Sequence, residues 1–315
     1  MQNEHNMKVA SSPHIRRART TSTIMLDVIL ALLPAGAAGV FYFGTRALLV
    51  ILLAVVGAVA SEFLYNRLTH RKQTIGDFSA VVTGLLLAYN MPVSVPLWMP
   101  VVGAVLAIVL VKMFFGGIGC NFVNPALAAR AILMTSWVDH MSGQAFSVAV
   151  RGVDAVTGAT PLTEEYRLLD LLLGRTPGCI GEVCRAAILL GAIYLVIRRV
   201  IAWQIPVTML GTVFILSYLT SGELTAGLDS AVYQLLSGGL MLGAWFMATD
   251  YTTSPVSTRG RVLFGVGCGL IVFVIRRFSS MPEGTSYAIL FMNLTVPLID
   301  RYIRPSVFGR GKKRG

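Results

Sequence analysis

The sequence predicts an all-α polytopic membrane protein, with about ten transmembrane helices arranged as two inverted five-helix repeats. Hydrophobic residues make up 55% of the 315 residues and charged residues only 13%, whereas roughly a quarter of an average soluble domain is charged. Apolar stretches recur along the whole chain, and a helix of about 20 apolar residues can cross a bilayer because it satisfies its own backbone hydrogen bonds. These stretches are continuous rather than alternating, which excludes the strands of a membrane barrel.

Ten apolar segments account for the membrane-embedded part of the chain. They cover residues 24–43, 47–65, 78–91, 97–115, 125–138, 186–197, 205–219, 231–249, 262–275 and 286–299. Several are shorter than a full span, as in proteins with interrupted helices. The first segment follows the basic residues Arg16, Arg17 and Arg19, as in a signal peptide, but its length and the many later spans predict that it is retained.

Charge predicts the orientation of these segments. The formal net charge of +11 is dispersed between them, so the expected partner is the lipid bilayer and not nucleic acid. Most of the 26 basic residues fall on one side if both termini are cytoplasmic, which is the arrangement that the positive-inside rule favours for an inner-membrane protein. Arg276 and Arg277 fall on the other side and conflict with the rule locally.

The same reading divides the chain into five parts. They are a cytoplasmic N-terminal segment 1–23, a first membrane repeat 24–138, an extracytoplasmic loop 139–185, a second membrane repeat 186–303 and a basic cytoplasmic tail 304–315. Within the loop, "LLDLLLG" is far too short to span a membrane and predicts a short helix lying on the surface.

The two membrane halves resemble one another weakly. "VVTGLLLAYNMPVSVP" and "LSGGLMLGAWFMATDYTTSP" each run from small residues through an apolar stretch to a polar break with proline. The breaks "FFGGIGCNFVNPALAARA" and "MPEGTSYAILFMNLTVPL" form a second pair. Five segments per half is an odd number, so the second half is expected to be inverted, with a site at the interface of the repeats. Chance similarity between apolar segments is the competing explanation.

The most specific motif is "DAVTGAT", residues 154–160, in the predicted outer loop. Written as Asp, two free positions, Ser or Thr, Gly, Ala and Thr, it has a chance frequency on the order of one in a thousand for a chain of this length. An ordinary polar loop is the alternative. Thr160 precedes Pro161, which favours an extended backbone and an exposed hydroxyl.

This motif, the "PHIRR" near the N-terminus and the "FFGGIG" and "NPA" breaks together resemble the RnfD family of Rnf electron-transport complexes, which is related to the NqrB family of sodium-pumping NADH:quinone reductases. The resemblance implies a complex that couples electron transfer between ferredoxin and NAD to Na⁺ or H⁺ translocation. It also implies FMN attached by a flavin transferase to Thr160, with Asp154, Thr157, Gly158 and Ala159 as the recognition context, and the other Rnf subunits as partners. Whether riboflavin binds in addition stays open.

The remaining polar residues give weaker predictions. Arg130, Arg151 and Arg167 are candidates to hold the FMN phosphate as charge-assisted partners. Asn124 and Arg130 follow the Gly-rich break and are candidates for a flavin site, with tight helix packing as the equal alternative. The charged residues in or beside apolar segments are expected mostly to snorkel or cap helices, and they are Asp27, Glu62, Lys112, Asp300, Asp77 and Asp250.

Asp77 and Asp250 are exceptions, because they flank corresponding segments of the two halves and charge inside a membrane is often functional. We therefore predict that Asp77 or Asp250 belongs to the ion pathway or to a helix break around a cofactor. The four cysteines fit no zinc or iron–sulfur spacing, and Cys179 and Cys184 are either paired in the outer loop or free. No residue is predicted to be catalytic and no metal site is predicted. The rival function is a channel or secondary transporter without redox chemistry.

Overall fold

The computed structural model describes residues 20–141, 147–148, 156–157, 167–220, 224–279 and 284–303. In that part of the chain the fold is helical, as predicted, apart from an antiparallel pairing of two short strands, β1 (Ser147–Val148) and β2 (Val156–Thr157). Within these ranges, three helices are long and apolar enough to cross a membrane: α1 (Thr21–Phe43), α2 (Thr45–Leu68) and α12 (Thr258–Phe278).

The first half contains two long helices followed by shorter ones. After α1 and α2 come the 3₁₀ turn η1 (Ile75–Asp77), α3 (Ser79–Tyr89), α4 (Trp98–Val105), the π-helix η2 (Leu106–Met113), α5 (Pro125–Ser136) and α6 (Val138–Met141). Local chemistry explains several boundaries. Thr20 and Thr23 form a capping box at the start of α1, and Gly44 separates α1 from α2 at φ 73°, a conformation that glycine adopts without strain.

The second half of the chain follows β2. It contains α7 (Leu168–Leu173), α8 (Arg185–Ile197), α9 (Gln204–Thr220), α10 (Leu224–Leu236), α11 (Leu240–Leu242), the π-helix η4 (Gly243–Met247), α12 and α13 (Thr285–Tyr302). The predicted short helix at "LLDLLLG" is confirmed as α7, which ends at Gly174 with φ 96°.

One apolar segment was predicted wrongly as a single span. Residues 231–249 belong to two helical pieces, because α10 begins at Leu224 and the chain breaks between Leu236 and Leu240. Gly238, at φ 61°, provides the left-handed position at the break. The apolar composition continues through this break, so composition alone did not reveal it.

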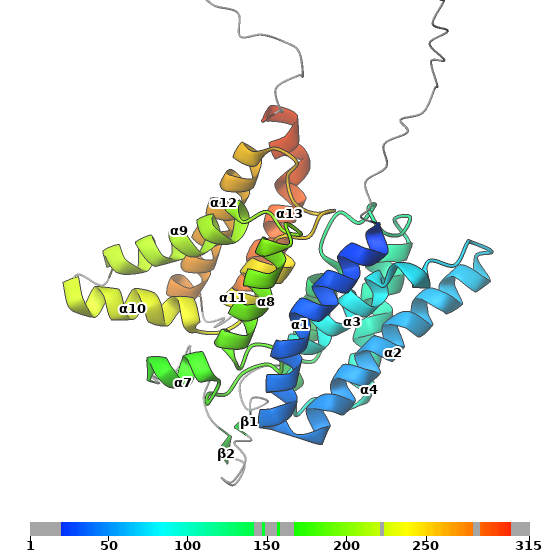
Figure 1. The fold of residues 1–315 in the computed structure, drawn as a ribbon, viewed down its shortest axis with the longest axis horizontal. Helices are drawn as coiled ribbons and strands as arrows, with labels where there is room; N and C mark the ends of the chain where they lie inside the picture. The colour runs from blue at the N-terminus through cyan, green and yellow to red at the C-terminus, as the bar shows by residue number, and fades with distance from the viewer. Residues whose placement is uncertain are drawn as a thin grey trace, which may run out of the picture.

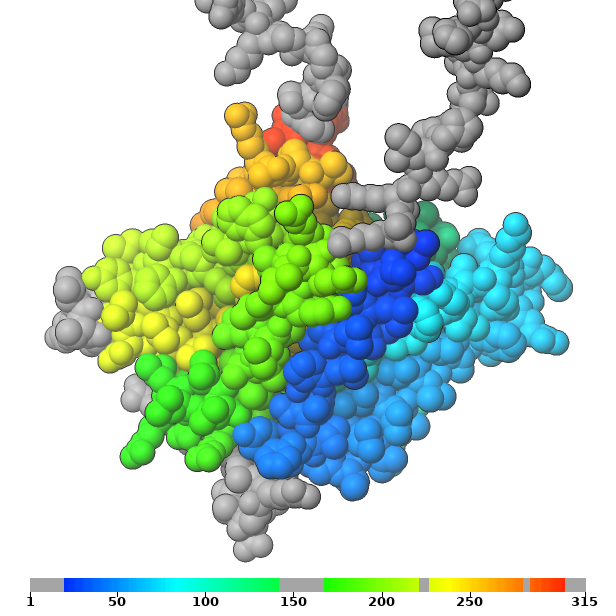
Figure 2. All heavy atoms as spheres, in the orientation of Figure 1, coloured from blue at the N-terminus to red at the C-terminus, as the bar shows by residue number. Residues whose placement is uncertain are grey.

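The two halves lie side by side (Figure 1). Helix α1 packs along α8, and α5 packs against α13, so elements from corresponding positions meet at the centre. Helix α2 lies on one flank with α4, while α9 and α10 form the opposite flank beside α12. The start of α1 and the end of α13 lie at the top of the view, and β1, β2 and α7 lie at the bottom. The space-filling view shows α1 and α8 in contact across the front surface (Figure 2).

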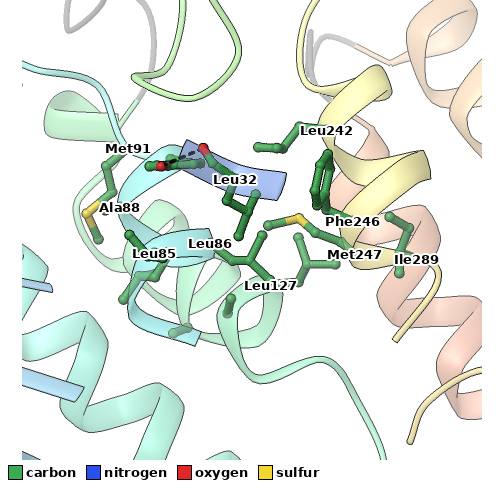
Figure 3. Close-up of a cluster of buried hydrophobic side chains, with 14 of the residues drawn as sticks. Leu32, Leu85, Leu86, Ala88, Met91, Leu127, Leu242, Phe246, Met247 and Ile289 are labelled. Atoms are coloured by element: carbon green, nitrogen blue, oxygen red, sulfur yellow. Dashed lines mark hydrogen bonds between the residues drawn. The ribbon is translucent and has the colours of Figure 1, made fainter. Parts of the chain in front are cut away.

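The core is shared by both halves (Figure 3). Leu86 and Leu127 of the first half meet Phe246 and Met247 of the second half in one buried cluster. Conversely, large apolar side chains cover much of the outer surface. Such a surface would be unusual in water and suits a protein surrounded by lipid. The exposed examples include Leu30, Leu52, Val56, Leu190, Ile215, Leu270 and Phe278.

Helix α3 is too short to cross the membrane. Its 11 residues span about 16 Å, roughly half the thickness of a bilayer's hydrocarbon core. The carbonyls at its end are satisfied by a later segment, residues 176–184, since Gly181 N donates to Tyr89 O and Ile180 N donates to Met91 O, both at 3.0 Å. A Cβ at Gly181 would collide with the Tyr89 side chain, so this close approach requires glycine.

Candidate functional site

Most of the predicted FMN attachment motif lies outside the described residues, namely Asp154, Gly158, Ala159 and Thr160. Thr157 is described for its backbone, in β2, where it pairs with Ser147. Arg151 also lies outside the described residues, and Arg167 precedes the first turn of α7. The attachment of FMN to Thr160 therefore stays a prediction.

A cavity of about 430 Å³ lies between the two halves. Its walls are mainly apolar, and Leu86 and Phe246, labelled in Figure 3, face it from opposite halves. Lys112, Asn121 and Asp250 supply polar groups. The other lining residues used below are Val82, Thr83, Ser79, Asn124 and Tyr251.

Asn124 stands where the two halves meet in the cavity wall. Its Oδ1 accepts hydrogen bonds from Ala126 N at 3.1 Å and Leu127 N at 3.3 Å, which makes it the N-cap of α5. Its Nδ2 donates to Met247 O at 3.2 Å, at the end of η4. Pro125 at the first helical position adds to the same signal. Asn124 therefore stabilises the helix break, as expected from the helix-packing alternative. It also lines a cavity large enough for a small ligand.

Arg130 is not among the residues that line this cavity. It is 2% exposed, and its Nη1 donates to Asn90 Oδ1 at 2.7 Å and to Ser286 Oγ at 3.0 Å. Glu182 Oε1 lies 3.7 Å from the same nitrogen. Arg130 therefore ties α5 to α3, α13 and the segment 176–184, and its proposed contact with a flavin stays a prediction.

The sequence analysis missed a buried ion pair. Glu62 and Lys112 were expected to snorkel or cap, yet they are 0% and 3% exposed, and Lys112 Nζ lies 2.7 Å from Glu62 Oε2. Lys112 Nζ also donates to Ser79 Oγ at 2.6 Å, and Thr74 Oγ1 donates to Glu62 Oε1. The sequence did contain a signal for this pair, because one acidic and one basic residue each lie deep within an apolar segment. Charged groups that are buried in such segments are normally paired with each other.

Asp77 is joined to this pair. Its Oδ1 accepts hydrogen bonds from Ser79 N at 2.8 Å and from the Ser79 hydroxyl, so it supports the first turn of α3. A continuous set of hydrogen bonds then leads through Ser79 to Lys112 and the cavity. Asp77 is thus within reach of the cavity through two side chains, but is not among its lining residues.

Asp250 lines the cavity directly. It lies between η4 and α12, outside the spanning helices, and its Oδ2 accepts hydrogen bonds from Thr252 Oγ1 at 3.0 Å and Thr253 Oγ1 at 3.3 Å. Desolvation raises the pKa of the Asp250 carboxyl above its usual value, and the threonine hydrogen bonds partly oppose this shift. Asp250 therefore lines the cavity, whereas Asp77 is connected to it only through hydrogen bonds to Ser79 and Lys112.

Asp27 and Asp300 were expected to snorkel or cap helices, and each makes contacts to another part of the chain. Asp27 Oδ1 lies 3.1 Å from Arg198 Nη2 and accepts from the Tyr194 hydroxyl at 2.9 Å, which links α1 to α8. Asp300 Oδ1 accepts from Val256 N at 3.1 Å. These contacts hold helices together, and neither acid is among the residues that line the cavity.

None of the four cysteines, all of which the structure describes, forms a disulfide. Cys179 is buried and its Sγ donates to Asn90 O at 3.3 Å, while Cys184 is partly exposed. Cys179 and Cys184 are therefore not joined by a disulfide in this structure. Within the described ranges, no three His, Cys, Asp or Glu side chains come together in a way that could hold a metal ion.

Comparison with known proteins gives a match over nearly the whole chain. Residues 8–309 match the NQR2, RnfD, RnfE family. The D component of the Na⁺-translocating ferredoxin:NAD⁺ oxidoreductase complex of Acetobacterium woodii is 45% identical over 98% of this chain and 96% of its own length. The D component of the proton-translocating ferredoxin:NAD⁺ oxidoreductase complex of Clostridium ljungdahlii is 40% identical over 96% of each chain. The D component of the ion-translocating oxidoreductase complex of Halorhodospira halophila is 38% identical over 96% of each.

Proposed function

Because this chain belongs to the NQR2, RnfD, RnfE family, we propose that it is the membrane flavoprotein subunit of an ion-translocating ferredoxin:NAD⁺ oxidoreductase complex. The relatives named above are D components of ion-translocating oxidoreductase complexes. The chain acts as one part of the redox-driven translocase and is not catalytic alone. Its partners are the other subunits of the complex and the lipid bilayer.

Electrons are relayed through FMN bound covalently to Thr160, which a flavin transferase attaches. The observation that carries this proposal is the motif "DAVTGAT" at residues 154–160. Bound flavin supplies one- and two-electron chemistry, while the protein provides its position and surroundings. A channel or secondary transporter of the same helical fold would leave the motif without a purpose. Flavin that stays on the denatured chain distinguishes the two functions, and the decisive variant is argued in the Discussion.

The chain crosses the inner membrane as two inverted repeats, residues 24–138 and 186–303, with both termini cytoplasmic. Several features support this arrangement. The short buried helices α3 and α11–η4 occur at corresponding places in the two halves, and α1 with α8 and α5 with α13 form like pairs. In this arrangement residues 139–185 form an outer loop between the repeats. It is supported by the start of α1 and the end of α13, which lie on the side opposite β1, β2 and α7 (Figure 1).

The cavity between the halves holds a second, noncovalent flavin, riboflavin. Its volume of about 430 Å³ falls in the range of about 300–1,000 Å³ of small-molecule sites. Apolar walls from both halves suit a flat aromatic ring, and Thr83, Asn121 and Asn124 offer hydroxyl and amide groups to a polar ring edge. Lys112, which is paired with Glu62, adds an ammonium group to the same wall.

Filling the cavity is expected to displace this flavin. Val82→Phe adds an aromatic ring to a side chain that lines the cavity, so riboflavin released from the purified complex by acid extraction should fall at least about tenfold, on the order of 1.4 kcal/mol. Covalent flavin should stay constant. Val81→Phe is the matched control, because the neighbouring Val81 is not among the lining residues. Normal riboflavin content in the Val82→Phe complex would contradict the assignment.

Asp77 and Asp250 take part in ion coupling. The relatives include complexes that are named for Na⁺ and for protons, and a carboxylate suits either ion. Asp250→Asn keeps the side-chain volume and removes the charge at the cavity. In proteoliposomes we expect ferredoxin-dependent NAD⁺ reduction to lose its coupled ion uptake, with both flavins retained. Asp300→Asn is the control, since the Asp300 carboxylate accepts from the backbone before α12 and lies outside the cavity wall. Normal ion uptake in both Asp77→Asn and Asp250→Asn complexes would rule the proposal out.

A further inference from the structure

A second cavity lies on the flank formed by α9, α10 and α12 (Figure 1). It has a volume of about 170 Å³, several times the ~30 Å³ that one water molecule occupies in the liquid. Two of its lining residues are Arg276 and Arg277, which fall on the outer side of the predicted topology and so conflict with the positive-inside rule. The lining residues are Val213, Ser217, Thr220, Ser230, Gln234, Phe273, Arg276 and Arg277.

Arg276 builds one wall of this cavity. Its Nη1 donates to Gln234 O at 2.6 Å and to Gln234 Oε1 at 3.2 Å, and its Nη2 donates to Ser237 O at 2.9 Å. The last turn of α12 is thereby fixed to the last turn of α10, where free carbonyls favour a cation. The cavity is therefore a built feature of the three-helix flank, and its shape does not depend on a ligand.

Arg277 and Ser217 direct further donors into the space. Arg277 is exposed, and among the described residues no carboxylate or carbonyl lies within hydrogen-bond distance of its guanidinium. Ser217 is only 6% exposed and lines the cavity, where its hydroxyl is a further hydrogen-bond donor. No Asp or Glu is found among the lining residues that the structure describes, and these residues offer a positive charge and hydrogen-bond donors to an anion.

The surroundings of the cavity identify the source of that anion. Leu219 at the end of α9 is 68% exposed and Phe278 at the end of α12 is 80% exposed. About one turn earlier in the same helices, Ile215 and Val274 are also exposed, so the cationic cavity lies at the end of an apolar surface that suits contact with lipid. We propose that this cavity binds the phosphate of a phospholipid, whose acyl chains lie along α9 and α12. Guanidinium groups match phosphate geometry, and basic pockets between membrane helices bind lipid headgroups.

The test measures lipid binding to the purified complex. The complex is washed with detergent to remove loose lipid and titrated with dihexanoyl phosphatidylglycerol, and bound lipid is counted by native mass spectrometry. Arg277→Gln should weaken one saturable site by about tenfold or more, because a charge-assisted hydrogen bond is lost. Ser217→Ala should weaken the same site. Arg259→Gln is the matched control, since Arg259 is an exposed arginine at the opposite end of α12.

Two further probes separate the sources of the ligand. Inorganic phosphate tests a free anion, and dihexanoylglycerol tests the apolar chains without phosphate. The proposal requires that phosphatidylglycerol bind more tightly than either probe at the site that depends on Arg277. Unchanged lipid binding in the Arg277→Gln complex would overturn it. Equal affinity for inorganic phosphate would identify a free-anion site instead, and equal affinity for dihexanoylglycerol would identify an apolar surface alone. Covalent flavin should be the same in all variants, so this result is independent of the proposed electron relay.

Discussion

Replacing Thr160 by valine is expected to abolish covalent flavin completely. Valine keeps the branching at Cβ and nearly the same volume, but it lacks the hydroxyl oxygen through which a phosphoester to FMN would form. No other atom at that position can replace this oxygen, so the expected effect is all or none. The abundance of the protein should change little, because surface substitutions usually alter stability by less than about 0.5 kcal/mol and residue 160 lies in the predicted outer loop.

The measurement is flavin fluorescence of the denatured protein on a gel, followed by the mass of the flavin peptide, after coexpression with a flavin transferase. A noncovalent flavin is lost on denaturation, so this signal reports only the linkage. Thr157→Val is the matched control, because it alters the recognition context and leaves the acceptor in place. It should reduce the fluorescence without moving the modified residue. Undiminished fluorescence in the Thr160→Val protein would eliminate the assignment.

Breaking the buried Glu62–Lys112 pair should have the largest effect on stability. Either Glu62→Gln or Lys112→Met leaves one charge without its partner in a site where both side chains are at most 4% exposed. Loss of one partner of such a pair costs about 3–5 kcal/mol. The double variant should be much closer to the parent protein, because replacing both members of a buried pair is often nearly neutral.

The double-mutant cycle is measured by thermal unfolding of the detergent-solubilised complex. The amount of this protein in the membrane is a second readout. The coupling between the two positions is the quantity of interest. Additive losses in the two single variants and the double variant would show that the ion pair contributes little. The Asp27–Arg198 pair provides a comparison, because the Arg198 side chain is 50% exposed and Arg198→Gln should cost about 1 kcal/mol or less.

The sequence predicted helices best where apolar length decides. The segment at 24–43 became α1 and the segment at 286–299 became α13, with ends shifted by a few residues. The segment at 231–249 failed because the polypeptide turns at Ser237–Gly239 without becoming polar. A break of this kind is stable only because other helices surround it, and that information is not local.

The residues of the candidate site also differ in whether the sequence alone reveals them. A motif such as "DAVTGAT" can be recognised from seven consecutive residues, since its meaning depends on a modifying enzyme that binds an extended segment. The cavity could not be predicted, because Val82, Asn124 and Asp250 meet there only after the two halves pack together. Glu62 and Lys112 are 50 residues apart in the sequence. They form an ion pair only because α2 packs beside η2 in the folded protein.

The segment 176–184 has a consequence for biogenesis. Translation completes α3 long before Ile180 and Gly181 emerge from the ribosome, yet these two residues supply the donors for Met91 O and Tyr89 O. An unsatisfied backbone group in hydrocarbon costs several kcal/mol. We therefore expect the end of α3 to reach its final packing only after residues 176–184 have been translated and placed beside it.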